Sequence, residues 1–228
     1  MSTPILTTPP TATTVWSAIL FDLDGTITDS APGITASLAR TFEALGRPVP
    51  DAAELLAYVG PPLLDSFRTR AGMSEDEAWE AIRVYRADYN GSALDTAVFP
   101  GVAGLIERIK TAGVPLALAT SKPETVATRI LEAFGLAENF DVICGATEDE
   151  SRSAKADIVA EALRRLREQG HDVSRAVMVG DRSYDTIGAA ANGLPTILVE
   201  WGYGSPAEAA DAYATVYSAD QLAKKLLG

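Results

Sequence analysis

Short apolar segments alternate with amphipathic helical segments over much of the chain, and this alternation restricts the fold more than any other feature. It begins near Val98, and its strand-like runs lie at 114–119, 176–179 and 196–199. Such an order is typical of a parallel β-sheet with helices on both faces. The earlier apolar run 15–21 predicts a buried central strand. We therefore expect an α/β fold built on a parallel sheet.

A different pattern separates the first strand from this alternating region. Ile34, Leu38 and Phe42 recur at helical spacing, and Ser74 with Glu77 forms a capping box that opens a further helix. These features predict an inserted all-α domain. We accordingly divide the chain into three parts. A Thr- and Pro-rich disordered tail covers 1–14, an α/β core is formed by the two segments 15–30 and 96–228, and a helical insert covers 31–95.

Composition excludes several classes of partner. The 228 residues include 31 acidic and 19 basic side chains, for a net charge of −12. Long nucleic acids and anionic membranes are therefore not expected partners, whereas a small anionic substrate needs only one locally positive pocket. We find no signal peptide and no apolar run near the ~20 residues of a membrane span, so we expect a cytoplasmic protein. The lone residues Cys144 and His171 are interpreted as structural, and the sequence leaves the oligomeric state open.

The predicted first strand ends in two aspartates. Side chains alternate along a strand, so Asp22 and Asp24 share a side while Leu23 faces away. Two carboxylates ~5 Å apart repel by ~3 kcal/mol at an effective dielectric of ~20, so positive charge is expected nearby. Gly25 permits an abrupt exit from the strand. The alternative is an ordinary acidic turn.

Thr120 and Ser121 follow the strand 114–119 and precede a predicted helix. Hydroxyl groups and free amides at a helix start bind phosphate oxygens, which predicts a phosphate site at this position. The structural alternative, compatible with the first, is that Ser121 and Glu124 form a capping box.

Two more aspartates follow the strand 176–179. Asp181 ends that strand and Asp185 opens the next helix. Carboxyl ends of parallel strands form one edge where ligands bind, so we expect these residues to join Asp22 and Asp24 there. Carboxylate oxygens in small number favour Mg²⁺. Asp185 either contacts the metal or orients Lys155.

Lys155 lies in the first turn predicted for its helix, behind the expected cap residue Ser153. The helix dipole disfavours a cation there by ~0.3 to 1 kcal/mol. Charge balance among the aspartates and a bound phosphate explains this placement, although first-turn lysines are also found simply solvated.

These motifs together resemble the haloacid dehalogenase superfamily, in its phosphatase branch with a helical cap after the first motif. The four matching motifs, in chain order, are Asp22-Leu23-Asp24-Gly25-Thr26, Thr120, Lys155 and Gly180 to Asp185. The resemblance implies a Rossmann-like core and a Mg²⁺-dependent mechanism through an aspartyl-phosphate. It implies that Asp22 attacks phosphorus and that Asp24 exchanges protons with the leaving oxygen and water. The implied metal ligands are the Asp22 carboxylate, the Asp24 main-chain carbonyl and Asp181, and the implied phosphate contacts are Gly25, Thr120, Ser121 and Lys155.

Within this superfamily the segments 60–63 and 100–102 resemble phosphoglycolate phosphatases. The segments 120–124, 180–182 and 201–204 are similar both to those enzymes and to 5′-nucleotidase-like relatives, which implies a small phosphorylated metabolite as substrate. The second aspartate, Asp24, argues against dehalogenation because a halide needs no proton. A sugar-phosphate mutase of the same fold stays open, as do a phospho-receiver domain and a non-catalytic binding module. The candidates for insert residues that determine the substrate are Arg68, Arg70 and the turn 60–62, and Arg68 is equally compatible with a solvated position on a helix.

Overall fold

A six-stranded parallel sheet forms the centre of the molecule. The computed structural model describes residues 16–228, and the tail predicted at 1–14 lies outside these residues. The strand order is β5-β4-β1-β6-β7-β8, and every neighbouring pair is parallel. The strands are β1 (Ala18–Phe21), β4 (Leu116–Pro123), β5 (Val142–Ala146), β6 (Ala176–Gly180), β7 (Thr196–Val199) and β8 (Ala214–Val216). The predicted α/β class with a parallel sheet is confirmed.

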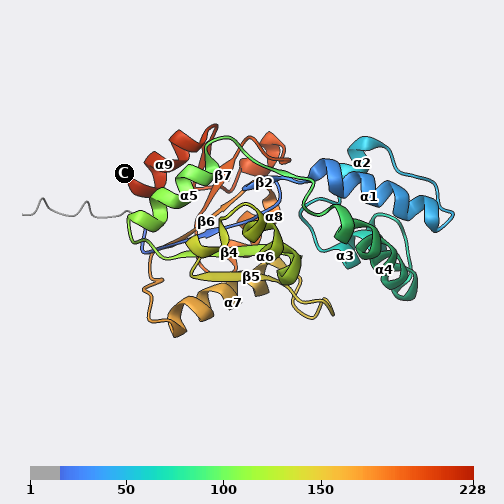
Figure 1. Cartoon of the computed structure of the whole chain (residues 1–228), viewed down its shortest axis with the longest axis horizontal. Helices are drawn as coiled ribbons and strands as arrows, with labels where there is room; N and C mark the ends of the chain where they lie inside the picture. Colours follow the sequence, from blue (N-terminus) through green and yellow to red (C-terminus); the bar gives the residue numbers. More distant parts are fainter. Residues whose placement is uncertain (1–15) are drawn as a thin grey trace, which may run out of the picture.

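Helices cover both faces of this sheet (Figure 1). The alternation along β1 separates the two layers: Ile19 and Phe21 pack into one apolar cluster, and Ala18 and Leu20 into the other. The first cluster includes α5 (Val102–Thr111), α6 (Glu124–Ala133) and α9 (Ala219–Leu227), and the second includes α7 (Lys155–Glu168) and α8 (Ser183–Ala190). Because both faces are covered, β1 is fully buried, as its continuous apolar run predicts.

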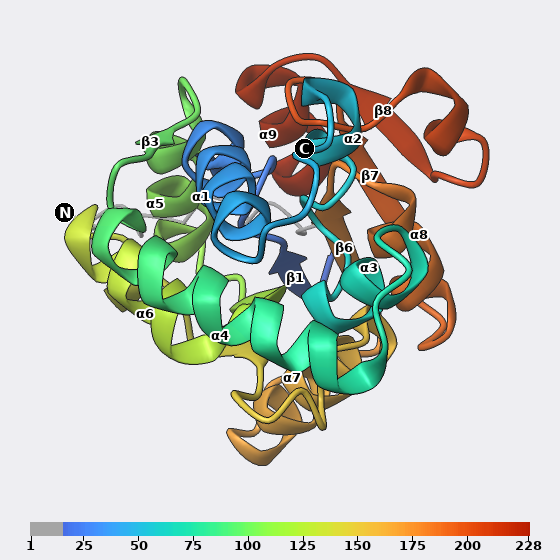
Figure 2. The same ribbon diagram turned by 90° about the vertical axis from the view of Figure 1, so that its right-hand side faces the viewer.

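The inserted segment folds into a separate helical cap, as expected. Figure 2 looks onto the cap, which lies over one end of the sheet. Its helices are α1 (Ala31–Ala44), α2 (Ala52–Leu56), α3 (Leu63–Thr69) and α4 (Glu75–Ser92). The predicted capping box is present, with Ser74 Oγ accepting from the Glu77 amide and the Glu77 carboxylate accepting from the Ser74 amide.

A short antiparallel ribbon, which the sequence pattern did not predict, joins the cap to the core. Strands β2 (Thr28–Asp29) and β3 (Ala97–Val98) pair directly, with Thr28 opposite Val98 and Asp29 opposite Ala97. The two chain segments that enter and leave the cap are therefore held side by side.

Two of the predicted helix starts are wrong. Helix α6 begins at Glu124 without a capping box from Ser121, because the Glu124 carboxylate accepts from the Gly145 amide at 3.2 Å and pairs with Arg165. Helix α7 has Ala154 at its N-cap, and the Ser153 hydroxyl donates to the Glu150 carbonyl. Glu124 is engaged by partners 21 and 41 residues away, which local sequence rules do not include, whereas the Ser153 hydroxyl turns back to Glu150 within its own loop.

The order of the strands reverses at β1, which has β4 on one side and β6 on the other. The chain first builds outward through β4 and β5, then returns across β1 to build β6, β7 and β8. In parallel sheets, a crevice for ligands opens outside the carboxyl ends of strands at such a reversal. The carboxyl ends of β1, β4 and β6 therefore mark the expected position of the site.

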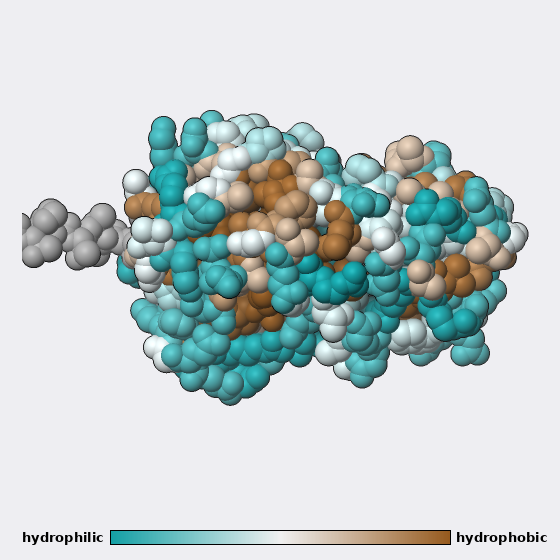
Figure 3. Space-filling view, in the orientation of Figure 1, coloured by the Kyte–Doolittle hydropathy of each residue, from teal (hydrophilic) through white to brown (hydrophobic). Residues whose placement is uncertain are grey.

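The surface of the molecule is largely hydrophilic. Hydrophilic side chains cover much of the face shown in Figure 3, and apolar patches lie between them. None of the helices within residues 16–228 combines the length and apolar composition required to cross a bilayer. Cys144 is buried in β5, in keeping with the expected packing role.

Candidate active site

A tight loop after β1 places the first two aspartates. The Leu23 carbonyl accepts from the amides of Ile27 and Thr28 at 2.8 and 2.9 Å, and the Gly25 amide donates to the Thr28 carbonyl at 2.9 Å. Gly25 has a φ of +83°, which a residue without a Cβ adopts readily. The loop turns the chain back at once, and both Asp22 and Asp24 line the same pocket.

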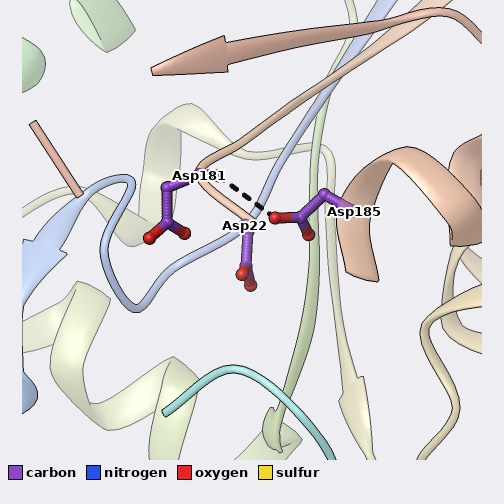
Figure 4. A group of neighbouring side chains, drawn as sticks. All are labelled: Asp22, Asp181 and Asp185. Atoms are coloured by element: carbon purple, nitrogen blue, oxygen red, sulfur yellow. Dashed lines mark hydrogen bonds between the residues drawn. The ribbon is translucent and has the colours of Figure 1, made fainter. Parts of the chain in front are cut away.

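Three carboxylates converge at this sheet edge (Figure 4). One oxygen from each of Asp22, Asp181 and Asp185 lies within 4.8 Å of the others, and all three residues are buried. They come from the ends of β1 and β6 and from the first turn of α8. The structure thus brings together the aspartates that the sequence assigned to one site.

The Asp181 carboxylate is held from two sides. Oδ2 accepts from the Tyr203 amide at 2.7 Å, and Oδ1 accepts from the Thr26 hydroxyl at 3.4 Å. Burial raises the pKa of Asp181 well above its ordinary value, and the negative charges of Asp185 and Asp22 raise it further. Negative charge therefore dominates the surroundings of Asp181, and the nearby Arg182 offsets only part of it.

Lys155 supplies the nearest cation to the other two aspartates. Its Nζ lies 2.9 Å from Asp22 Oδ1 and 2.8 Å from Asp185 Oδ1, and it donates to the Ala119 carbonyl at 3.2 Å. Burial lowers the pKa of Lys155, but Asp185 and Asp22 outweigh this and raise it above the ordinary value. Lys155 is therefore protonated, and the charge balance inferred from its position in the first turn of α7 is present.

Asp185 is occupied by contacts within the protein. Its Oδ1 pairs with Lys155, and its Oδ2 accepts from the amides of Asp181 and Arg182, both at 3.1 Å. Burial raises the pKa of Asp185, and the charge of Lys155 opposes that change. Of the two roles left open for Asp185, these contacts favour orienting Lys155 and the loop after β6.

The donor set fits a magnesium ion. Asp22 Oδ1 and Asp185 Oδ1 are buried, and although both lie close to Lys155, neither accepts a hydrogen bond of good geometry within residues 16–228. Three buried carboxylates against one contacting lysine leave an excess of negative charge. Hard oxygen donors of this number and charge suit Mg²⁺, which also retains water ligands.

The other side of Asp22 faces a pocket between the core and the cap. Thr120 and Ser121 at the end of β4 lie on its wall, and Ser121 Oγ is buried without a hydrogen-bond partner in the described chain. A free buried hydroxyl suits an incoming oxygen atom. The cap contributes Ile34, Tyr58, Val59, Gly60, Pro61, Leu63, Tyr85, Arg86, Tyr89 and Asn90 to the lining.

The expected substrate-determining residues of the cap are only partly found there. Gly60 and Pro61 line the pocket, whereas Arg68 and Arg70 are exposed and do not. The arginine that reaches the pocket is Arg86 on α4, which pairs with Glu150 at 2.6 Å. Arg68 on α3 and Arg70 directly after this helix are therefore solvated residues outside the pocket, which is the alternative that the sequence left open for Arg68.

Several residues that shape the site were not assigned from the sequence. Lys122 lies 3.1 Å from Asp24 Oδ2, and the Ser30 hydroxyl donates to Asp24 Oδ1. Gly202 packs so closely against Asp181 that a Cβ there would overlap the Asp181 side chain. Lys122 and Gly202 both belong to sequence segments that resemble the superfamily, so a signal existed for them. Nothing local indicated that Ser30 would turn toward Asp24.

The fold and the site together define an α/β protein with a Rossmann-like parallel sheet, a helical cap and an acidic centre at the carboxyl edge of the sheet. The sequence pattern of the haloacid dehalogenase-like hydrolases matches residues 19–199. This match covers most of the chain, so the protein belongs to that family. A phospho-receiver domain is thereby set aside.

Named relatives within the family differ in activity. Tyrosine-protein kinase PtkA of Mycobacterium tuberculosis is 48% identical over 188 residues, which cover 82% of this chain but 62% of the relative's length. A 5′-nucleotidase of Pseudomonas aeruginosa is 38% identical, covering 90% of this chain and 92% of the relative. A phosphoglycolate phosphatase of Caulobacter vibrioides is 34% identical, covering 89% and 87%.

Solved structures show the same architecture. The crystal structure of a predicted phosphatase from Clostridium acetobutylicum superposes with a TM-score of 0.86 at 39% identity, covering 92% of this chain and 98% of that one. The Rossmann-like core with a helical cap is therefore shared with relatives of substantial sequence similarity.

The packing of Gly25 generates a first prediction. A Cβ at Gly25 would overlap the Asp181 carboxylate, so we expect Gly25→Ala to displace Asp181 and reduce both Mg²⁺ affinity and phosphatase turnover by about 10-fold or more. Gly170→Ala is the matched control, because Gly170 has a similar φ of +86° and open space around it. Both variants should lose about 1 to 2 kcal/mol of unfolding free energy from backbone strain. Equal turnover in the two variants would contradict this interpretation of Gly25.

Proposed function

We propose that the protein is a Mg²⁺-dependent phosphatase that hydrolyses a small phosphate monoester through a phosphoryl group carried on Asp22. The observation that carries the proposal is the position of Asp22. Its carboxylate ends the central strand, lies 2.9 Å from Lys155, belongs to the cluster with Asp181 and opens onto the pocket that Asp24 also lines. A carboxylate in this setting suits nucleophilic attack on a phosphoryl group.

The residues of the chain have distinct parts in this reaction. An Asp22 oxygen attacks phosphorus, and the bond from phosphorus to the leaving oxygen breaks. Lys155 reduces the repulsion between Asp22 and the anionic phosphoryl group. Asp24 gives a proton to the leaving oxygen and then takes one from the water that hydrolyses the aspartyl-phosphate. Water thus ends as part of inorganic phosphate, and Asp22 is regenerated.

The remaining polar groups hold the substrate and the cofactor. The Asp22 and Asp181 carboxylates and the Asp24 main-chain carbonyl would hold Mg²⁺, which when bound neutralises phosphoryl charge. The hydroxyl groups of Thr120 and Ser121 are suited to donate to phosphoryl oxygens, and the unpartnered Ser121 Oγ supports this role. The contact predicted between the Gly25 backbone and phosphate is part of the same proposal.

The nucleophile assignment has a direct test. Asp22→Asn should lower kcat by roughly 10³-fold or more, because an amide is not a competent nucleophile for phosphorus. The metal-free variant should unfold at a higher temperature than the metal-free parent, because the change removes one of three crowded negative charges. Calorimetry and phosphate release check the two effects, and the exposed Asp211→Asn is the control.

Metal dependence is measured on the same preparations. EDTA should abolish turnover of the parent protein, and added Mg²⁺ should restore it. Near-normal turnover by the Asp22 variant would remove Asp22 from the role of nucleophile.

The substrate class is tested with a panel of phosphoglycolate, nucleoside 5′-monophosphates and sugar phosphates. Relatives named 5′-nucleotidase and phosphoglycolate phosphatase support the first two classes. We expect kcat/KM with Mg²⁺ to favour one of these classes over hexose phosphates by about 10-fold or more, which corresponds to ~1.4 kcal/mol of transition-state binding. A preference for hexose phosphates would favour the mutase alternative.

Phosphoryl transfer to a hydroxyl acceptor is a second candidate, supported by the 48% identity to relatives named tyrosine-protein kinase. The chain spans 62% of the length of those relatives, so their activity does not extend to it without a test. The comparison to make is between substrate consumed and inorganic phosphate released. A phosphatase releases one phosphate per substrate, even with a tyrosine peptide present. If labelled phosphate from the substrate is found on the peptide, and the yield of free phosphate falls by the same amount, phosphoryl transfer is established.

A further inference from the structure

A second buried lysine lies beside Asp24, the proposed general acid, and outside the cluster of Asp22, Asp181 and Asp185. Lys122 is only 7% exposed, and its Nζ lies 3.1 Å from Asp24 Oδ2. The same ammonium group donates to the Tyr89 hydroxyl at 2.8 Å. The other buried lysine, Lys155, serves Asp22 and Asp185 instead. The two neighbouring aspartates of the first motif therefore have separate cations.

Both oxygens of Asp24 are fixed by hydrogen-bond donors or charge. Ser30, at the N-cap of α1, donates to Oδ1, and Lys122 approaches Oδ2. Each carboxyl oxygen has two lone pairs, so these contacts leave a position for the proton that Asp24 transfers. The plane of the Asp24 carboxyl group is thus set from two directions.

Tyr89 connects this arrangement to the cap. It lies near the end of α4, is 5% exposed and stacks on Tyr85 with ring centroids 5.3 Å apart. Its position is therefore fixed by packing within the cap. The Tyr89 hydroxyl then holds the ammonium of Lys122, which belongs to the core strand β4. A continuous chain of contacts leads from the cap helix through Lys122 to Asp24.

We propose that Lys122 is a positioning residue that holds Asp24 in the orientation for proton transfer, and that Tyr89 makes this orientation depend on the seated cap. The inference rests on the proposed phosphatase function. A role for Lys122 in binding the transferred phosphoryl group is less favoured, because its contacts are to Asp24 and Tyr89 while Lys155 lies at Asp22.

This role has a specific kinetic signature. A poor leaving group such as an alkyl oxygen needs the proton from Asp24, whereas an aryl oxygen leaves with little help. Misplacing Asp24 should therefore slow alkyl ester hydrolysis far more than aryl ester hydrolysis. A misplacement near 1 Å costs on the order of 100-fold in rate. The loss of rate should appear in kcat and not in KM, because substrate binding through Lys155 and the hydroxyl groups of Thr120 and Ser121 is preserved.

The experiment measures kcat and KM with Mg²⁺ for phosphoglycolate and for p-nitrophenyl phosphate. Asp24→Ala provides the pattern expected when the acid is removed. Lys122→Met should reproduce this pattern with a fall of about 10- to 100-fold in kcat for the alkyl ester, and less than about 3-fold for the aryl ester. Lys122→Arg should recover part of the alkyl activity, because it retains the charge and a donor.

Tyr89→Phe tests the contribution of the cap. This change removes one hydroxyl group and leaves the pair between Lys122 and Asp24, so it should give the same selective loss in smaller measure. If Lys122→Met does not fold, the Tyr89→Phe variant by itself tests the positioning role of Lys122. Lys110→Met is the control, since Lys110 pairs with Asp141 at 3.0 Å on another part of the core.

The outcomes separate this inference from the proposed function. Equal losses on both esters, or a raised KM with unchanged kcat, would overturn the positioning role in favour of substrate binding. Normal kinetics in Lys122→Met, or in Tyr89→Phe where the lysine variant does not fold, would overturn it as well. If the parent protein releases no phosphate from any ester with Mg²⁺, the proposed function itself fails.

Discussion

The structure depends on the electrostatic constraint at the carboxyl end of β1. Three buried carboxylates lie within 4.8 Å of one another, and each pair repels by roughly 3 kcal/mol at an effective dielectric near 20. Lys155 offsets part of this repulsion from the first turn of α7, and the amides of the loop after β6 offset more. The remaining imbalance supports the proposal that the site binds a divalent cation. Under that proposal, stability is given up here for binding.

The same constraint explains why the two aspartates of the first motif have different environments. Asp22 faces Lys155 and the other carboxylates, whereas Asp24 faces Lys122 and the Ser30 hydroxyl. Asp22, the proposed nucleophile, thus lies among other carboxylates and beside Lys155. Asp24, the proposed acid and base, lies where donors fix its plane beside the pocket. Chemically identical side chains two residues apart have different surroundings because different elements contact them.

Much of the fold and the centre of the site followed from sequence because these features are periodic or local. Alternating strands and helices predicted the parallel sheet, and strand ends predicted that Asp22, Thr120 and Asp181 would approach one another. The failures have two physical causes. Glu124 accepts from the Gly145 amide, and Lys122 acquires Tyr89 as a partner only when the cap packs on the core. Contacts across such sequence separations have no local pattern, so these assignments required coordinates. The hydroxyl groups of Ser153 and Ser30 instead donate to Glu150 and Asp24, three and six residues away, in irregular loops whose course periodicity does not predict.

The division between core and cap separates the groups proposed to act on the phosphoryl group from those that would contact the rest of the substrate. The core supplies the carboxylates, Lys155 and the hydroxyl groups, which in the proposed reaction concern only the phosphoryl group. The cap supplies the aromatic and apolar wall of the pocket, where Tyr58, Pro61 and Leu63 lie. The one cap arginine that lines this pocket, Arg86, is paired with Glu150, so its charge is largely compensated. The cap wall therefore presents shape and hydrogen-bonding groups more than net charge to the leaving group of the proposed reaction. Under this proposal, changes in the cap would alter which ester or acceptor fits, while the chemistry at Asp22 would stay the same. The contact from Tyr89 through Lys122 to Asp24 is where the two parts meet, because there the cap reaches the group that we propose transfers a proton.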